Sequence, residues 1–230
     1  MKKFIILVFG LFLFLAIGIP KEKKFLGDCT AYFPMREGAE FVIKNYNSKG
    51  KYQGKAEHKV LSKDESGDNL QVSVASKIFD KKDEELTNLE YQVRCVDGQF
   101  EFKMTGGLSM DQMAGAGMNT TVDGDFLDIP ADASPGQDLK DGRVTINISE
   151  VMRITTTISN RKVEAIEEIT TEAGTFECMK ITYDIETKML MTFRGSAAEW
   201  YAKEVGMVRS ESYNKKGKLT GYSELASISN

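Results

Sequence analysis

Only a few residues of this chain combine the types and the spacing that chemistry needs. The single histidine, His58, lies in the segment KAEHKV, and a serine–histidine–aspartate hydrolase would have to use it. No G-x-S-x-G motif supplies the nucleophile, and no H-E-x-x-H, C-x-x-C or glycine-rich nucleotide-binding motif occurs. We therefore interpret His58 as a histidine on the surface of a strand. We predict a protein that is not an enzyme and that binds no cofactor.

Two groups of residues carry donor atoms that metals prefer. Oxygen ligands in DGDFLD would suit calcium, but their spacing departs from the EF-hand loop. Thioether pairs would suit Cu(I), but one of the pairs also fits core packing on one face of a strand. The carboxylates are Asp123, Asp125 and Asp128, and the pairs are Met110 with Met113 and Met189 with Met191. We predict no metal site, with calcium and Cu(I) as the alternatives.

The N-terminus has the pattern of a secretory signal peptide. Lys2 and Lys3 precede an unbroken apolar run over residues 4–19, which the segment PKEKK ends. This run is shorter than the ~20 residues that a membrane-spanning helix needs. Small residues near its end predict cleavage after Gly18, so residues 1–18 would be a signal peptide and the protein would be periplasmic or otherwise exported. An uncleaved N-terminal anchor is the alternative.

The three cysteines are interpreted in the light of export. Export permits disulfides, and an odd number leaves one thiol over. Cys178 lies in an apolar strand, where a free thiol behaves as a small hydrophobic residue. We therefore predict a disulfide between Cys29 and Cys95, which would stabilise the fold by about 4 kcal/mol. The alternatives are three reduced thiols and a lipoprotein acylated at Cys29; Asp28 disfavours acylation, because a small residue is required before the cysteine.

Length and charge limit the class of protein. The mature chain would have roughly 210 residues, enough for one domain with a hydrophobic core. The formal net charge of −4 becomes −6 without Lys2 and Lys3, and the other lysines are interspersed with acidic residues. An acidic chain without a basic block argues against nucleic acid and against an anionic membrane surface. The protein would be peripheral to a membrane at most.

Most of the chain after Gly38 alternates apolar and polar residues with the period of β-strands. Segments such as LQVSVASKIF, LEYQVRCV and RVTINIS are separated by turn signals such as Asp97-Gly98. Consecutive strands that are joined by tight turns pair antiparallel. The sequence predicts a lead-in over residues 19–38 and one all-β domain over residues 39–230. This domain would be an open, strongly curved antiparallel sheet, or half-barrel.

Two decapeptides near opposite ends of the chain are nearly the same. NYNSKGKYQG (residues 45–54) and SYNKKGKLTG (residues 212–221) are identical at six of ten positions. In both, an aromatic strand end leads into a lysine-glycine-lysine turn and then into another strand. A glycine in the left-handed conformation, Gly50 or Gly217, would close each hairpin, and the lysines would keep its tip solvated. We interpret the pair as one hairpin used twice; a phosphate- or glycan-binding loop is the alternative.

One strand has an irregular apolar pattern. In TFECMKITYDI the apolar residues skip from Cys178 to the adjacent Met179 before the alternation resumes. A β-bulge between these two residues would keep both halves of the strand facing the core, and sheets bend at bulges. We expect strong curvature at this point.

The segment TGGLSMDQMAGAGMNT breaks the β pattern. It covers residues 105–120, is rich in glycine and alanine, and is long for a hairpin connection. Its thioether side chains suit an irregular apolar space. We predict a short, partly helical segment over one opening of the sheet, with Met110, Met113 and Met118 as ligand-binding residues.

The C-terminal half has recognisable segments. VDGDFLDIP, SNRKVEAIEEITTEAGTFECMKITYDI and AAEWYAKEVGMVRSESYNKKGKLTGYSEL resemble the TapB family, an uncharacterised family of exported proteins with a domain of unknown function. AGTFEC and EWYAKEVGMVRSE are the most specific parts, and the resemblance covers the chain from CTAYFPMREGAEF onward. It implies no catalytic residue, because that family has no established activity. The order of strands is also similar to the half-barrels of periplasmic lipoprotein carriers, which implies a fold and no function.

These observations predict a non-catalytic periplasmic or envelope protein. Its concave sheet would bind an apolar or amphipathic ligand, such as a lipid or a lipoprotein-like molecule, because small-molecule sites are usually concave and mostly apolar. The alternative is a structural interaction module that docks another envelope protein and has no ligand cavity.

Overall fold

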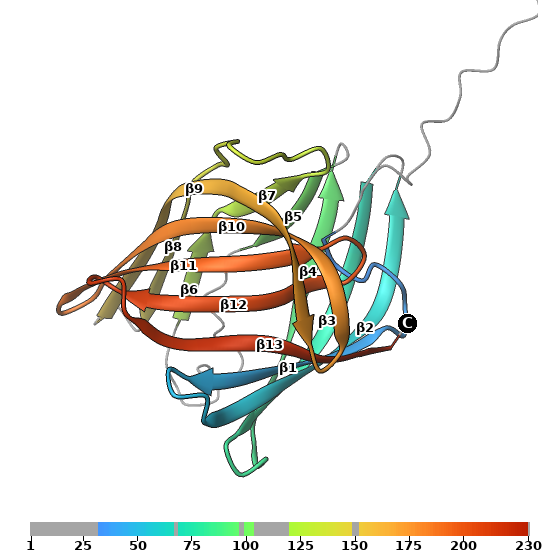
Figure 1. The fold of residues 1–230 in the computed structure, drawn as a ribbon, viewed down its shortest axis with the longest axis horizontal. Coiled ribbons are helices and arrows are strands. Elements are labelled where there is room, and N and C mark those ends of the chain that lie inside the picture. The colour runs from blue at the N-terminus through green and yellow to red at the C-terminus, as the bar shows by residue number, and fades with distance from the viewer. Residues whose placement is uncertain (1–31, 67–68, 97–98, 104–119, 149–151, 230) are drawn as a thin grey trace, which may run out of the picture.

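A computed structural model describes residues 32–66, 69–96, 99–103, 120–148 and 152–229 of the 230-residue chain (Figure 1). Thirteen antiparallel strands form one continuous sheet. The strands are β1 (Glu40–Asn47), β2 (Tyr52–Ser66), β3 (Asn69–Asp80), β4 (Glu85–Val96), β5 (Gln99–Lys103), β6 (Thr120–Gly124), β7 (Phe126–Pro130), β8 (Gly142–Ile148), β9 (Met152–Thr171), β10 (Gly174–Lys188), β11 (Thr192–Ala202), β12 (Gly206–Asn214) and β13 (Leu219–Ser229). No helix in these ranges is long and apolar enough to span a membrane.

The strand order confirms the predicted open, curved antiparallel sheet. It runs β6-β8-β9-β10-β11-β12-β13-β1-β2-β3-β4-β5-β7, so β6 and β7 are the two edges. Neighbours in the sequence are mostly neighbours in the sheet, as tight turns require. The sheet coils so far that β1 to β4 face the strands β9 to β13 across a common interior (Figure 1). The predicted glycine- and methionine-rich segment lies outside the described residues.

The two edges come together although no backbone ladder joins them. β6 and β7 are separated in the chain by Asp125 alone, so the chain steps from one edge of the sheet to the other. Asp125 is fixed at this step by two bonds to Arg143: its backbone N–H donates to the Arg143 carbonyl (2.9 Å), and its carboxylate accepts the Arg143 N–H (2.8 Å). The half-barrel is therefore held nearly closed by its own covalent chain.

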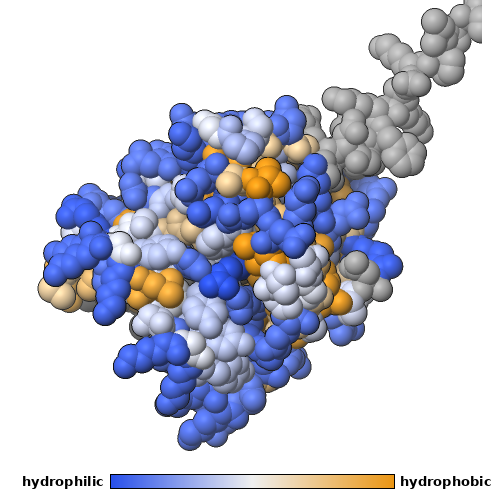
Figure 2. All heavy atoms as spheres, in the orientation of Figure 1, coloured by the Kyte–Doolittle hydropathy of each residue, from blue (hydrophilic) through white to orange (hydrophobic). Residues whose placement is uncertain are grey.

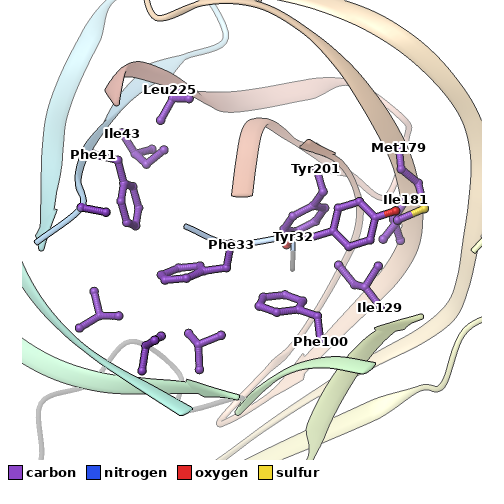
Figure 3. Close-up of a cluster of buried hydrophobic side chains, with 14 of the residues drawn as sticks. Tyr32, Phe33, Phe41, Ile43, Phe100, Ile129, Met179, Ile181, Tyr201 and Leu225 are labelled. Carbon is purple, nitrogen blue, oxygen red and sulfur yellow. The ribbon is translucent and has the colours of Figure 1, made fainter. Parts of the chain in front are cut away.

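The interior is filled in part by the N-terminal segment. Tyr32 and Phe33, which the sequence analysis assigns to the lead-in, are 3% and 9% exposed and belong to the main buried cluster. Phe33 lies in the middle of the half-barrel in Figure 3, with its ring centroid 5.5 Å from Phe41 and 6.3 Å from Phe100. Burying an aromatic side chain contributes about 2–3 kcal/mol. The concave face therefore holds a segment of its own chain at its centre.

The twin decapeptides form the same hairpin turn. In the β1–β2 turn, the Asn47 side-chain oxygen accepts the N–H groups of Lys49 (2.9 Å) and Lys51 (3.1 Å). In the β12–β13 turn, Asn214 accepts those of Lys216 (2.9 Å) and Lys218 (3.2 Å) in the same way. These bonds confirm that one hairpin is used twice.

The glycines of the two turns have matching roles. Gly50 and Gly217 have φ of 73° and 70°, a conformation that glycine adopts without strain. At the last identical position, a Cβ on Gly54 would lie 2.2 Å from the Phe79 carbonyl oxygen, and one on Gly221 would lie 2.8 Å from that of Tyr46. The repeated asparagines and glycines are thus explained by backbone geometry. The repeated lysines contribute to these turns only through their backbone N–H and C=O groups.

The prediction of a bulge between Cys178 and Met179 is wrong, and the burial of both residues has another explanation. The register of β10 against β9 is regular there and shifts between Lys180 and Ile181, and again between Thr182 and Asp184. Cys178 and Met179 are both buried (0% and 2% exposed) because the two faces of β10 are covered here. Met179 packs in the main cluster, and Cys178 packs in a second one.

A long hairpin creates that second cluster. The free end of β9–β10 continues past the end of β11 and crosses in front of β11, β12 and β13 towards β1 (Figure 1). Its Glu172 carboxylate lies 2.6 Å from Lys44 Nζ on β1. Beneath it lie small and aromatic side chains of β11 and β12, namely Ala198, Trp200, Ala202 and Val208. The sheet therefore has two apolar layers at this end.

Candidate functional site

A crevice opens where the two apolar clusters meet. It has a volume of about 350 Å³ and lies between the β9–β10 hairpin, the end of β11 and the N-terminal segment. Tyr32, Met179 and Tyr201 from the main cluster line it, as do Cys178 and Ala202 from the second cluster. Figure 3 shows the first three of these side chains within the interior. The crevice is thus a gap in the seam between two cores.

The mouth of the crevice combines apolar and charged side chains. Ile166, which also lines it, is 46% exposed, so a large apolar side chain faces solvent there. The exposed residues Glu177 and Lys203 supply one charge of each sign. The crevice thus offers both apolar and polar groups, a combination that a small amphipathic molecule can use.

A half-buried carboxylate lies beside the wall of the crevice. Glu199 on β11 accepts hydrogen bonds from the hydroxyls of Tyr183 (2.7 Å) and Tyr201 (2.8 Å), one on each oxygen. Burial raises the pKa of both phenols well above their usual value, and the Glu199 charge raises them further. Both phenols therefore stay protonated and act as donors. This cluster ties β10 to β11 and leaves no free acid or base.

His58 lies on the inner face of the sheet, which corrects the prediction of a surface histidine. Its ring stacks on Phe41 with centroids 4.5 Å apart, and its Nδ1 lies 3.2 Å from the Tyr91 hydroxyl. Burial lowers the pKa of His58 to about 4, so the ring is neutral at pH 7. The residues around His58 in the sequence do not indicate this position, because Phe41, which stacks on the ring, comes from the neighbouring strand β1.

A serine sits directly across from this histidine. Ser76 on β3 pairs with His58 in the register, is 1% exposed, and its hydroxyl has no hydrogen-bond partner among the described residues. A serine nucleophile needs a base that is hydrogen-bonded to it and oriented by a third group. His58 instead faces Tyr91, so the geometry is that of aromatic core packing.

The acidic residues that could have bound calcium do not converge. Asp123 and Asp125 are exposed beside a surface hollow that Asp141 and Arg143 also line. Asp128 points elsewhere, with Oδ1 3.8 Å from the buried Arg161. Within the described ranges, no three histidine, cysteine, aspartate or glutamate side chains are placed to hold a metal ion.

The methionines chosen from the sequence fall in different places. Met110, Met113 and Met118, the predicted ligand-binding residues, lie outside the described residues. Met189 and Met191 were compatible with core packing on one strand face, but they lie in the β10–β11 turn and are 42% and 67% exposed. The crevice residues had no sequence signal, because three segments that are far apart in the chain form it.

One prediction about the cysteines is confirmed, namely that Cys178 is a free thiol in the core. Cys178 is a buried free thiol, and burial raises its pKa to about 12. Cys95 on β4 is also buried, at 1% exposed. Cys29 lies outside the described residues, so the Cys29–Cys95 disulfide stays a prediction.

Comparison with known proteins places this fold in a family. A profile of DUF3108-like domains matches residues 36–225. The chain belongs to the DUF3108-like family. The resemblance to an uncharacterised family is confirmed at this level, whereas the comparisons do not support the TapB family or lipoprotein carriers in particular. None of the curated proteins matches the chain.

Two solved structures are similar to this DUF3108-like protein over nearly their whole length. One is a protein of Bacteroides fragilis whose name describes it as exported with a YmcC-like fold: 28% identity, 86% of this chain and 98% of that chain covered, and a TM-score of 0.73. The other is a protein of Parabacteroides distasonis that is named as a lipoprotein: 26% identity, 87% and 99% covered, and a TM-score of 0.74.

Proposed function

We propose that this DUF3108-like protein is a non-catalytic exported protein that binds an amphipathic molecule with an apolar chain in the crevice. The observation that carries the proposal is the position of the crevice at the seam of two apolar clusters, with about 350 Å³ of space. Ligand sites typically have volumes of roughly 300–1,000 Å³. The volume is at the lower end, which suits one chain rather than a bulky polycyclic ligand.

The lining indicates how such a molecule would lie. Phe176, Met179 and Tyr201 offer apolar surface inside, and Lys203 offers a cation at the mouth. A carboxylate or phosphate group of the ligand would pair with Lys203 while the chain fills the gap. Each buried CH₂ of the ligand would contribute about 0.8 kcal/mol.

The polar groups near the crevice support binding rather than catalysis. The carboxylate of Glu199 already accepts two phenol hydrogen bonds, and both phenols stay protonated. His58 stacks in an aromatic cluster around Phe41 instead of facing the crevice. General acid–base catalysis needs a group that can reach the reacting atoms and exchange a proton near neutral pH.

Export is supported by two independent observations. The chain begins with the lysines and the apolar run of a signal peptide. The similar structures come from proteins that are named as exported and as a lipoprotein. A periplasmic or envelope location would bring the crevice close to lipids and other amphipathic molecules.

Fluorescence of N-phenylnaphthylamine, which increases when this apolar probe leaves water, tests the proposal. We expect the protein to bind the probe and a long-chain fatty acid to displace it. Ile166→Glu places a charge at the mouth of the crevice and should weaken binding about ten-fold or more, because the bound apolar molecule would have to displace water from that charge. Leu61→Glu is the matched control, since Leu61 is 40% exposed on β2 and distant from the crevice lining.

The same experiment separates the two functional classes. A structural interaction module without a ligand site would leave the probe fluorescence unchanged. Equal binding by the Ile166→Glu variant and the wild type would show that the probe sits elsewhere, and either result would overturn the proposal.

A further inference from the structure

Three hairpin turns lie next to one another at one end of the sheet. The last residues of β12 and the first of β11 pair as Asn214 with Gly195, so the β12–β13 turn adjoins the β10–β11 turn. Asn47 pairs with Gly221, which places the β1–β2 turn on the other side of β13. The N-terminal segment approaches the opposite end, where a Cβ on Gly206 at the start of β12 would lie 3.6 Å from Pro34 and from the Tyr32 carbonyl oxygen. We call the three turns the tip surface.

The β10–β11 turn carries the two most exposed large apolar side chains of the described residues, with a third in the turn and a fourth at the start of β11. Leu190 is 95% exposed, Met191 67%, Phe193 52% and Met189 42%. The β10–β11 ladder continues to Thr192, three residues beyond the last pair with β12 at Gly195, so this turn projects by about 10 Å. Figure 2 shows apolar colour at this projecting end, on the left of the molecule. Nothing in the described fold packs against it.

The two twin turns supply positive charge beside this apolar projection. Their side chains are exposed, and no ion pair within the described ranges involves them. The five lysines are Lys49, Lys51, Lys215, Lys216 and Lys218. The turns use only the backbone N–H and C=O groups of the repeated lysines, which almost any residue would supply. The backbone geometry of the two turns therefore does not explain why both turns have lysine at the same positions.

The fold concentrates a charge that the chain as a whole does not have. The net charge is −4, and the lysines of the two turns are about 165 residues apart in the sequence. Pairing of β1 with β13 brings them together. The next turn along, β3–β4, has Lys81 and Lys82 beside Asp83 and Glu84, so its charges balance and the basic region ends there.

We propose that the tip surface docks on an anionic bilayer, with the β10–β11 turn entering the interface and the twin lysine turns facing lipid phosphates. Apolar residues flanked by cations are the combination that peripheral membrane proteins use. The apolar residues stand on a narrow projection, which can enter a fluid interface but offers little area to the flat surface of a protein. This inference does not depend on the crevice.

Co-sedimentation of the mature protein with vesicles tests the inference. Vesicles of phosphatidylglycerol and phosphatidylethanolamine should retain the protein, added salt should release it, and phosphatidylcholine vesicles should retain much less. Leu190→Ser with Phe193→Ser should weaken binding about ten-fold. Neutralising Lys215, Lys216 and Lys218 to Gln should weaken it about ten-fold or more.

Matched controls keep the result specific to this surface. Leu86→Ser removes an apolar residue that is 63% exposed on β4, and Lys59→Gln removes an exposed lysine on β2; both should bind like the wild type. Ile166→Glu should also sediment normally, which separates this inference from the proposed ligand site. All variants should melt within a few degrees of the wild type. The inference is overturned if the wild type stays in solution with the anionic vesicles, as docking to an acidic protein would predict, or if the tip variants bind as well as the controls.

Discussion

Arg161 and Asp128 meet across the gap between the two edges of the sheet. Arg161 on β9 donates to the Asp128 carbonyl on the edge strand β7 (3.1 Å) and to the Lys140 carbonyl (2.7 Å), and its Nη1 lies 3.8 Å from Asp128 Oδ1. The guanidinium is 3% exposed. Burial lowers its pKa, and the nearby acidic groups partly offset this effect. A side chain of β9 thus reaches the edge strand β7, with which β9 shares no backbone ladder.

Replacing Arg161 should therefore destabilise the whole half-barrel. Arg161→Met keeps much of the volume but leaves two carbonyl oxygens and the Asp128 carboxylate without a cation. Removing one partner of a buried ion pair typically costs about 3–5 kcal/mol, and the partial exposure of Asp128 (19%) favours the lower value. Urea unfolding measures the change in the free energy of unfolding.

Lys162→Met is the control for this change, because Lys162 is the next residue on β9 and is exposed. It should alter stability by less than about 0.5 kcal/mol. Equal effects of the two substitutions would show that Arg161 does not hold β7 against β9.

The twin hairpins predict a contrast between glycine and lysine. Gly217→Val forces a β-branched residue to adopt φ near 70° and should cost about 1–2 kcal/mol, although a Cβ there meets nothing within 4 Å. Lys216→Gln leaves the backbone bond to Asn214 intact and should be neutral. Thermal melts of the two variants measure the difference. If Lys216→Gln lowered the melting temperature and Gly217→Val did not, the repeat would not be explained by backbone geometry.

Local features of this fold were accessible from the sequence. The alternation in LQVSVASKIF gives β3 its buried Leu70, Val72 and Val74, because side chains on a strand alternate between the two faces. The asparagine and glycine of the repeated decapeptide predict their own turn, because the bonds that define it lie within five residues. Such signals depend only on near neighbours in the chain.

The candidate site depends on contacts that the sequence does not encode locally. Cys178 and Met179 read as a bulge because the pattern assumes one buried face, whereas side chains of β11 and β12 cover the second face of β10. Tyr32 read as part of a lead-in because its partner surface is formed by β10 and β11. The crevice exists only where these distant segments meet.

The depressed pKa of His58 predicts a loss of stability at mildly acidic pH. The pKa is about 4 in the folded state and 6.5 ordinarily, so the unfolded chain binds more protons between these values. This contribution is fully present above pH 6.5 and is lost as the pH falls through about 4. The difference corresponds to about 3 kcal/mol. Because His58 is the only histidine in the chain, an NMR titration of its ring signals gives the pKa directly.

His58→Phe provides the comparison for the pH dependence. A phenyl ring can stack on Phe41 and cannot be protonated, so the fall in stability between pH 6.5 and 4 should become shallower. A folded-state pKa near 6.5 in the NMR titration would contradict the buried position of the ring.

Thiol reactivity distinguishes the three cysteines. Cys178 is fully buried and its pKa is raised to about 12, so a maleimide should not react with the native protein. In denaturant without reductant one thiol should react, and after reduction three should react, as the predicted Cys29–Cys95 disulfide requires. Peptide mapping identifies the linked pair. Three reactive thiols in denaturant without reductant would rule out the disulfide.

Trp200 reports whether the β9–β10 hairpin stays docked over β11 and β12. It is the only tryptophan, it is 6% exposed, and its Nε1 donates to the Glu167 carboxylate on the hairpin. Glu167→Ala leaves a buried donor without its partner and should cost about 1–2 kcal/mol. Because the hairpin would then detach more often, tryptophan emission should shift to longer wavelength and acrylamide quenching should increase.

Glu168→Ala is the matched control, since Glu168 is the next residue, is also exposed, and does not accept the Trp200 hydrogen bond. Unchanged emission, quenching and melting of the Glu167→Ala protein would show that the hairpin is held by its apolar contacts alone.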